Sequence, residues 1–67
     1  SAAAVAAWEK DYLPGTAVVH RSFGPGVVES RAGSLAVIDF GEAGVRKVEL
    51  AACLRRRLIR LASSPGF

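Results

Sequence analysis

Glycine and proline interrupt the chain after Pro14 about once every ten residues, and the runs between them are short and rich in β-branched side chains. Such punctuation is typical of a small antiparallel sandwich or barrel. The predicted strands comprise residues 16–20, 26–31, 35–40, 45–50 and 58–61. None of the connections has the length, roughly a dozen residues, that a parallel crossover requires. We therefore expect an all-β fold, a five-stranded antiparallel barrel over residues 14–62.

Residues 21–25 are predicted to form the first turn of this barrel. Gly24 and Gly26 flank Pro25, so the chain can reverse tightly there and re-enter the sheet, with a β-bulge as one way of doing so. Phe23 in the same turn is placed to fold over the open end of the barrel. The turn thus combines backbone freedom with one large apolar side chain.

The other connections are equally short. Gly33 accepts the positive φ that a hairpin turn requires, and Gly44 ends the turn between the third and fourth runs. Small residues at 51–54 interrupt the strand pattern, which predicts a single helical or 3-10 turn before the last strand.

The third run is the most hydrophobic, and we expect it to be the central strand. Side chains alternate between the two faces of a strand, so Ile38 and Phe40 share a face and form the centre of the predicted core. By the same alternation, Val18 and His20 share one face of the first strand. His20 is therefore expected to be a structural residue that hydrogen-bonds across the neighbouring turn.

The chain has 67 residues, of which 51% are apolar, so it forms one small domain. A substrate cavity of roughly several hundred Å³ would remove much of the core that such a domain can build. Residues 1–13 form an alanine-rich leader, expected to be a short helix or a linker, and residues 63–67 are expected to be a flexible tail. The leader is too short to span a bilayer or to act as a signal sequence. Because Ser1 stands where a start methionine would, we expect a domain cut from a longer protein.

The residue pattern gives no support for catalysis, cofactor binding or metal binding. His20 has no nucleophile and carboxylate placed to complete a triad. Cys53 is the only cysteine, which excludes an internal disulfide and a metal-ligand pair with His20 and favours a reducing, cytoplasmic setting. The Gly-Pro-Gly around Pro25 lacks the Lys and Ser/Thr of a phosphate loop. We expect no catalytic residue, no cofactor, no metal, no small-molecule substrate and no membrane association.

One motif resembles a known bacterial domain. The pattern H-x-x-F-G-x-G-x-V begins at His20 and ends at Val28, and V-I-D-F follows at 37–40 and G-V-R-K-V at 44–48. This pattern is similar to the Tudor-like domain, an SH3-like barrel, at the C-terminus of UvrD/PcrA-type DNA helicases and of some RecQ-type helicases. It is more distantly similar to the RNA-polymerase-interacting domains of CarD and Mfd. The likeness covers about residues 13 to 62.

The resemblance implies that the chain is an accessory domain of a bacterial DNA helicase or of a transcription or repair protein. On this basis we expect it to be a monomeric module near the nucleoid that docks onto a protein partner, either RNA polymerase or a repair factor. Small barrels can do this by offering an edge strand to the partner's sheet. The parent protein would be an ATP-dependent helicase, although this chain carries no motor residues.

A second hypothesis rests on a basic cluster. The chain carries a net charge of +3, and Arg55, Arg56, Arg57 and Arg60 place four positive charges within six residues. This cluster could bind DNA without reading its sequence, with further charges at Arg21 and Arg46 widening the surface. It could equally be a solvated turn that keeps the domain soluble. Arg46 and its neighbour Lys47 are adjacent on a strand and therefore point to opposite faces.

Overall fold

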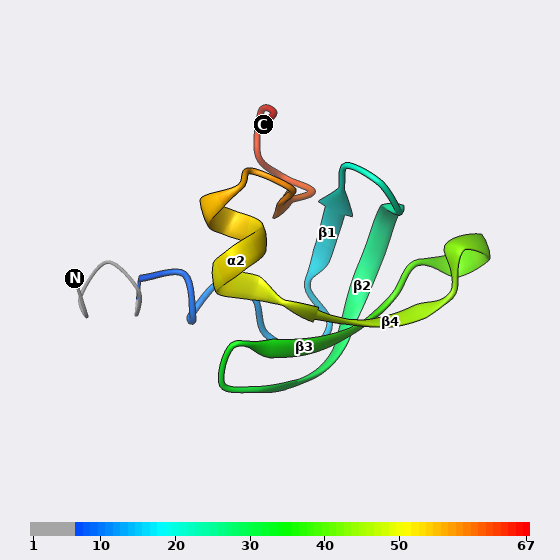
Figure 1. The fold of residues 1–67 in the computed structure, drawn as a ribbon, viewed down its shortest axis with the longest axis horizontal. Helices are drawn as coiled ribbons and strands as arrows, with labels where there is room; N and C mark the ends of the chain where they lie inside the picture. Colours follow the sequence, from blue (N-terminus) through cyan, green and yellow to red (C-terminus); the bar gives the residue numbers. More distant parts are fainter. Residues whose placement is uncertain (1–6) are drawn as a thin grey trace.

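The computed structural model describes residues 7–67, and the first six residues of the leader lie outside this range. The described residues form a five-stranded antiparallel sheet with one short α-helix before the last strand (Figure 1). The elements in chain order are β1 Ala17–His20, β2 Gly24–Ala32, β3 Leu35–Asp39, the 3-10 helix η1 Gly41–Ala43, β4 Val45–Glu49, α2 Leu50–Arg55 and β5 Ile59–Leu61. The expected all-β, barrel-like architecture is confirmed.

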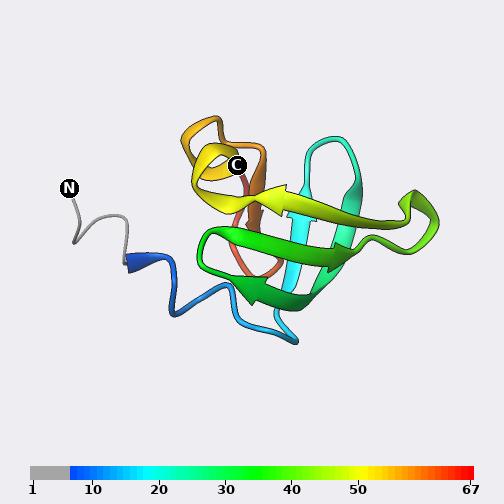
Figure 2. The ribbon, with the colours of Figure 1, turned by 60° about the horizontal axis from the view of Figure 1, so that its bottom comes forward.

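The strands lie in the order β4-β3-β2-β1-β5. The first three connections are hairpins, whereas α2 carries the chain from β4 across to β5, which pairs with β1. The sheet bends strongly along β2, so that β3 and β4 run across β1 and the first part of β2, while the second part of β2 pairs with β3 (Figures 1 and 2). Among the described residues, β4 and β5 are the two outer strands of this bent sheet.

The boundaries of β2 differ from those predicted. The strand begins at Gly24, because Gly24 and Pro25 already pair with His20 and Val19 of β1. Proline is tolerated here because its nitrogen faces the side away from β1, where β3 has already ended and no hydrogen bond is lost. This orientation follows from Val28, whose N–H points toward β1 and donates to the carbonyl oxygen of Thr16 at 3.0 Å. Backbone groups alternate along a strand, so those of Val28 and Pro25 point to opposite sides.

The β-bulge lies within β2 and not at the turn. It falls between Val28 and Ser30, where the register with β3 shifts. The other boundary differences are small. Phe40 follows β3 rather than belonging to it, and α2 has six residues instead of a single turn. Its start is fixed by Glu49, whose carboxylate accepts the Ala52 N–H at 2.9 Å and thus caps the helix.

The core fills the inside of the bend. Ile38 is fully buried and Phe40 is only 4% exposed, as the alternation predicted. The buried apolar residues are Tyr12, Val18, Val28, Ala36, Ile38, Phe40, Val48, Leu50 and Ile59. Tyr12 comes from the leader segment, and its side chain is part of this core.

Trp8 and Arg31 fix the leader onto the sheet. The Trp8 ring packs edge-on against Tyr12, with 6.5 Å between the ring centres. The Arg31 guanidinium lies over Trp8, and its Nη1 donates to the carbonyl oxygen of Glu9 at 2.9 Å. The end of the leader therefore packs against the barrel, whereas the first six residues of the leader, expected to be a short helix or a linker, lie outside the described residues.

Gly26 allows two parts of the core to approach closely. A Cβ atom at this position would lie 2.6 Å from Cδ1 of Phe40 and 2.9 Å from the Asp39 carbonyl oxygen. Close packing therefore requires glycine at position 26. Gly24 and Gly44 have a different role, because their φ angles of +79° and +90° allow the chain to turn.

Within residues 7–67, no helix has the length and apolar character needed to cross a membrane.

Candidate interaction surfaces

The outer edge of β4 presents unpaired backbone groups. At the two ends of the β3–β4 ladder, Leu50 N–H donates to Ser34 at 2.7 Å and Phe40 N–H donates to Gly44 at 2.9 Å. Hydrogen-bonded and non-hydrogen-bonded pairs alternate along an antiparallel ladder. The backbone N–H and C=O groups of the odd-numbered residues of β4 therefore point away from β3. Of these, Val45 and Lys47 have no backbone partner among the described residues, whereas the Glu49 carbonyl accepts the first hydrogen bond of α2.

Exposed apolar side chains adjoin this edge. Val45 is 57% exposed, and the register places it beside Asp39 of β3, which in turn lies beside the exposed Val27 of β2. On the same outer face Leu35 is 47% exposed and lies beside Glu49. The sequence analysis missed this face, although the alternation of Val45, Lys47 and Glu49 would have indicated it.

Arg46 points to the opposite side of β4 from Lys47. Its register partner is the buried Ile38, so its side chain starts on the core side and extends over the open end of the barrel. The guanidinium lies 4.1 Å from the centre of the Phe23 ring, and Nε donates to the Ala43 carbonyl oxygen at 2.9 Å. The predicted opposite orientation of Arg46 and Lys47 is confirmed.

His20 holds the turn beneath Arg46. Its Nδ1 accepts the backbone N–H of Ser22 at 3.0 Å and lies 3.4 Å from that of Phe23. The imidazole stacks on the Phe23 ring at 4.5 Å and meets Phe40 edge-on at 5.9 Å. Burial lowers the pKa of His20, which favours the neutral ring that this acceptor role requires. The structural role predicted for His20 and the predicted fold of Phe23 over the barrel end agree with this geometry.

Arg60 organises the chain after β5 instead of facing a ligand. It is partly buried, and its Nη1 donates to the carbonyl oxygens of Leu61, Ala62 and Ser64 at 3.2, 3.4 and 3.1 Å. These bonds hold a turn that brings the predicted tail back onto the barrel. The ring of Phe67 lies there beneath two guanidinium groups, 4.3 Å from that of Arg21 and 5.0 Å from that of Arg60.

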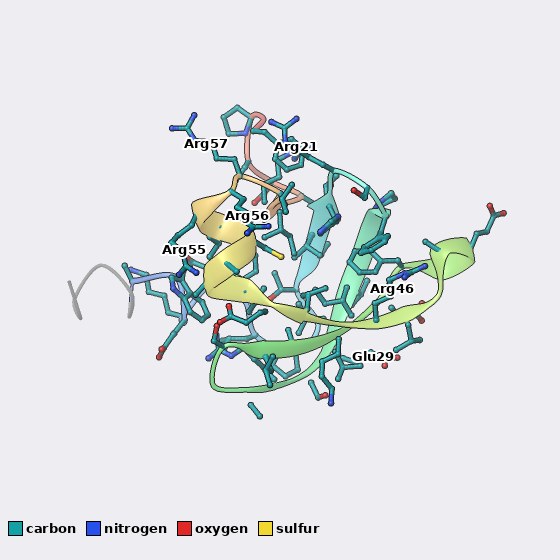
Figure 3. All side chains as sticks on the ribbon, viewed as in Figure 1. Arg21, Glu29, Arg46, Arg55, Arg56 and Arg57 are labelled. Carbon is teal, nitrogen blue, oxygen red and sulfur yellow. The ribbon has the colours of Figure 1, made fainter. Side chains whose placement is uncertain are left out.

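The three consecutive arginines diverge from one another. Figure 3 shows Arg55, the last residue of α2, directed toward the N-terminal segment, and Arg57, which follows the helix, on the side of Arg21. Arg46 lies on the far side of the molecule in the same view. The six arginines proposed from the sequence therefore do not form a single surface. Only Arg21 and Arg57 are joined directly, because Arg21 Nε donates to the Arg57 carbonyl oxygen at 2.7 Å.

Arg57 adopts an unusual backbone conformation at the end of α2. Leu58 N–H donates to the Cys53 carbonyl oxygen at 2.8 Å and Arg57 N–H to that of Leu54 at 3.1 Å. This pair of bonds is the Schellman ending of a helix, in which the residue at the position of Arg57 is usually glycine. Arg57 has a φ of 55°, and it is the only non-glycine residue of the described chain with a positive φ.

Cys53 and the carboxylates form no metal site. Among the described residues there is no group of three or more His, Cys, Asp or Glu side chains placed to hold a metal ion. Burial raises the pKa of the Cys53 thiol, which favours its neutral, unreactive form.

No protein-family model matches the sequence, and no curated protein matches it either.

Proposed function

We propose that this chain is a non-catalytic docking module that binds a protein partner by accepting an extended strand at the β4 edge. The observation that carries this proposal is the open edge of β4, where Val45 and Lys47 present backbone groups with no partner among the described residues, beside exposed apolar side chains. An added strand would pair with these groups, and its side chains on the same face would contact Val45 and its neighbours.

The exposed charge of Lys47 favours an acidic partner segment. Lys47 lies on the outer face of β4, so a strand beside β4 meets its positive charge on that face, whereas Arg46 is held over Phe23. Exposed edges carry lysine in many proteins because the charge prevents unselective pairing. The same charge selects a partner strand that has Asp or Glu at the facing position and an apolar residue opposite Val45.

The resemblance to the helicase-associated Tudor-like domain suggests the class of partner. By this analogy the chain belongs to a DNA helicase or a transcription or repair protein and docks onto RNA polymerase or a repair factor. His20 and Phe23, the motif residues, support the barrel end and leave the β4 edge free. The motif is thus part of the scaffold, and the contact surface lies elsewhere.

DNA binding by the whole basic cluster has less support. Arg60 is engaged by carbonyl oxygens, Arg46 lies over Phe23, and Arg55 points away from Arg57. A surface that follows a nucleic-acid backbone needs its charges on one side of the molecule.

Two substitutions at Lys47 test the proposal. Lys47→Pro removes the outward N–H and blocks the edge, yet the β3–β4 ladder does not use that N–H. Lys47→Ala removes the same charge and keeps the N–H. With purified bacterial RNA polymerase, or repair proteins, immobilised on a sensor, we expect Lys47→Pro to weaken binding at least about tenfold and Lys47→Ala by about threefold or less. Equal effects of the two substitutions, or no binding by the unmodified chain, would contradict docking through this edge.

A further inference from the structure

Two arginines occupy the end of the molecule where the α2–β5 connection meets the end of β1. Arg21 directly follows β1, and Arg57 ends the helical connection before β5. Both side chains lie next to the C-terminal segment in Figure 3, and both residues are exposed. Arg46 of β4 lies well away from this end in Figure 3, so the end is separate from the proposed docking edge on the same strand.

The positive φ of Arg57 suggests that its side chain has a function other than stabilising the fold. The Schellman ending needs a residue with positive φ, and glycine meets that need without strain. An arginine at this position is conformationally unfavourable, and its side chain is exposed. Strained residues of this kind cluster at functional sites, so the exposed guanidinium is the feature that offers a reason for arginine here.

Arg21 is aligned by two contacts. Its Nε donates to the Arg57 carbonyl oxygen at 2.7 Å, and its Cζ lies over the Phe67 ring, 4.3 Å from the ring centre. Both contacts restrain the side chain before any ligand arrives. Since Nε is engaged, the two terminal nitrogens remain as the donors, and this pair suits the bidentate recognition of phosphate oxygens.

Phe67 is held in place by the network around Arg60. Arg60 Nη1 donates to Leu61, Ala62 and Ser64, which turns the chain so that Phe67 returns to Arg21. Phe67 is therefore a positioning residue that acts through Arg21. Asp11 lines the same hollow as Arg57 and Phe67, and it is the acidic side chain there that would oppose an anion.

We infer that Arg21 and Arg57 form a contact site for the phosphate groups of a DNA backbone, with Phe67 aligning Arg21. Contacts from arginine to phosphate oxygens carry no sequence information, so binding at this site is independent of sequence. Two phosphate contacts give weak binding in isolation, and the site therefore supplements a stronger contact made by the rest of a larger protein. The inference does not depend on docking at the β4 edge.

The test compares matched charge removals in the full 67-residue chain. A fluorescent DNA duplex of about 20 base pairs is titrated at several low salt concentrations. Arg57→Gly removes a guanidinium while giving the αL position the residue it favours, so a loss of affinity cannot be ascribed to unfolding. Lys47→Gln removes one charge from the other side of the molecule and serves as the control.

We expect Arg57→Gly and Arg21→Gln each to weaken binding about threefold or more and to reduce the salt slope by about one. Lys47→Gln should change affinity less than about twofold. Phe67→Ala, which leaves the charge unchanged, should weaken binding in the same direction as Arg21→Gln, and Asp11→Asn should strengthen it.

Several outcomes would overturn the inference. These are an equal loss for Lys47→Gln and Arg57→Gly, an unchanged affinity for Phe67→Ala, and absence of duplex binding at the lowest salt. Polyglutamate that competes as well as unlabelled duplex would show that the arginines recognise carboxylates, which also contradicts the assignment to phosphate.

Discussion

The Arg46 guanidinium lies 4.1 Å from the centre of the Phe23 ring, on the side of β4 opposite to Lys47. Phe23 in turn stacks on His20, and its ring lies 5.3 Å from that of Phe40. One arginine, one phenylalanine and one histidine thus form a layered closure over the end of the barrel. Arg46 belongs to the scaffold through this closure, whereas its neighbour Lys47 is exposed on the outer face of β4.

Replacing Arg46 by alanine should therefore destabilise the domain. The change removes the contact with Phe23 and the hydrogen bond to Ala43, and we expect the free energy of unfolding to fall by about 1 kcal/mol. Lys47→Ala, the adjacent control, should stay within about 0.5 kcal/mol of the unmodified chain. Urea unfolding followed by circular dichroism measures both, and similar losses for the two variants would contradict the distinction.

Gly26 provides a second test of the core. Gly26→Ala places a methyl group 2.6 Å from Cδ1 of Phe40, so Phe40 or the backbone at Asp39 must move. We expect the free energy of unfolding to fall by about 1–3 kcal/mol, the range for overpacking a closely packed interior. Thermal unfolding is a suitable measurement. An unchanged midpoint would show that the barrel end yields easily and that the contact is not a constraint.

The architecture was predictable because its signals are local. Glycine positions and the alternation around Ile38 indicated five antiparallel strands, and these signals survive in the structure almost unchanged. The early start of β2 was not predictable. Pro25 can pair with β1 only because β3 has ended on the side that its nitrogen faces. The start of β2 therefore depends on the neighbouring strands and not on the turn residues alone.

The arginine surface was less predictable for a geometric reason. Neighbouring residues on a helix do not face the same way. The sequence analysis placed residues 55–57 after a short helical turn, whereas α2 continues to Arg55 and ends through Arg57, so the three side chains diverge. The approach of Phe67 to Arg21 joins residues 46 positions apart, a long-range contact for which the sequence offers no periodic signal.

Arg57→Gly should make the domain more stable. The substitution places glycine at the one non-glycine position with positive φ in the described chain, and it relieves an unfavourable conformation of about 1 kcal/mol. Arg56→Gly is the matched control, since Arg56 has a φ of −91° and gains nothing from glycine there. We expect the urea midpoint to rise for Arg57→Gly and to stay or fall for Arg56→Gly. A fall for Arg57→Gly would mean that its side chain stabilises the fold more than its backbone strains it.

Stability should decrease in mildly acidic solution because of His20. Burial lowers its pKa below the ordinary value of 6.5, so the unfolded chain takes up the proton at a higher pH than the folded chain. The contribution of the neutral ring is therefore complete above that value and is lost as the pH falls through it toward the folded pKa. Protonation also removes the Nδ1 lone pair that accepts the Ser22 N–H, which loosens the turn under Phe23.

The variant His20→Gln separates this effect from that of the carboxylates. Glu49, whose pKa is lowered chiefly by the Ala52 N–H, loses its contribution only as the pH falls below its ordinary value of 4.5. Urea unfolding between about pH 8 and pH 3 should show two declines for the unmodified chain, and only the lower one for His20→Gln. A variant that keeps the upper decline would show that a group other than His20 binds the proton, and the role of its ring beneath Phe23 and Arg46 would then need another explanation.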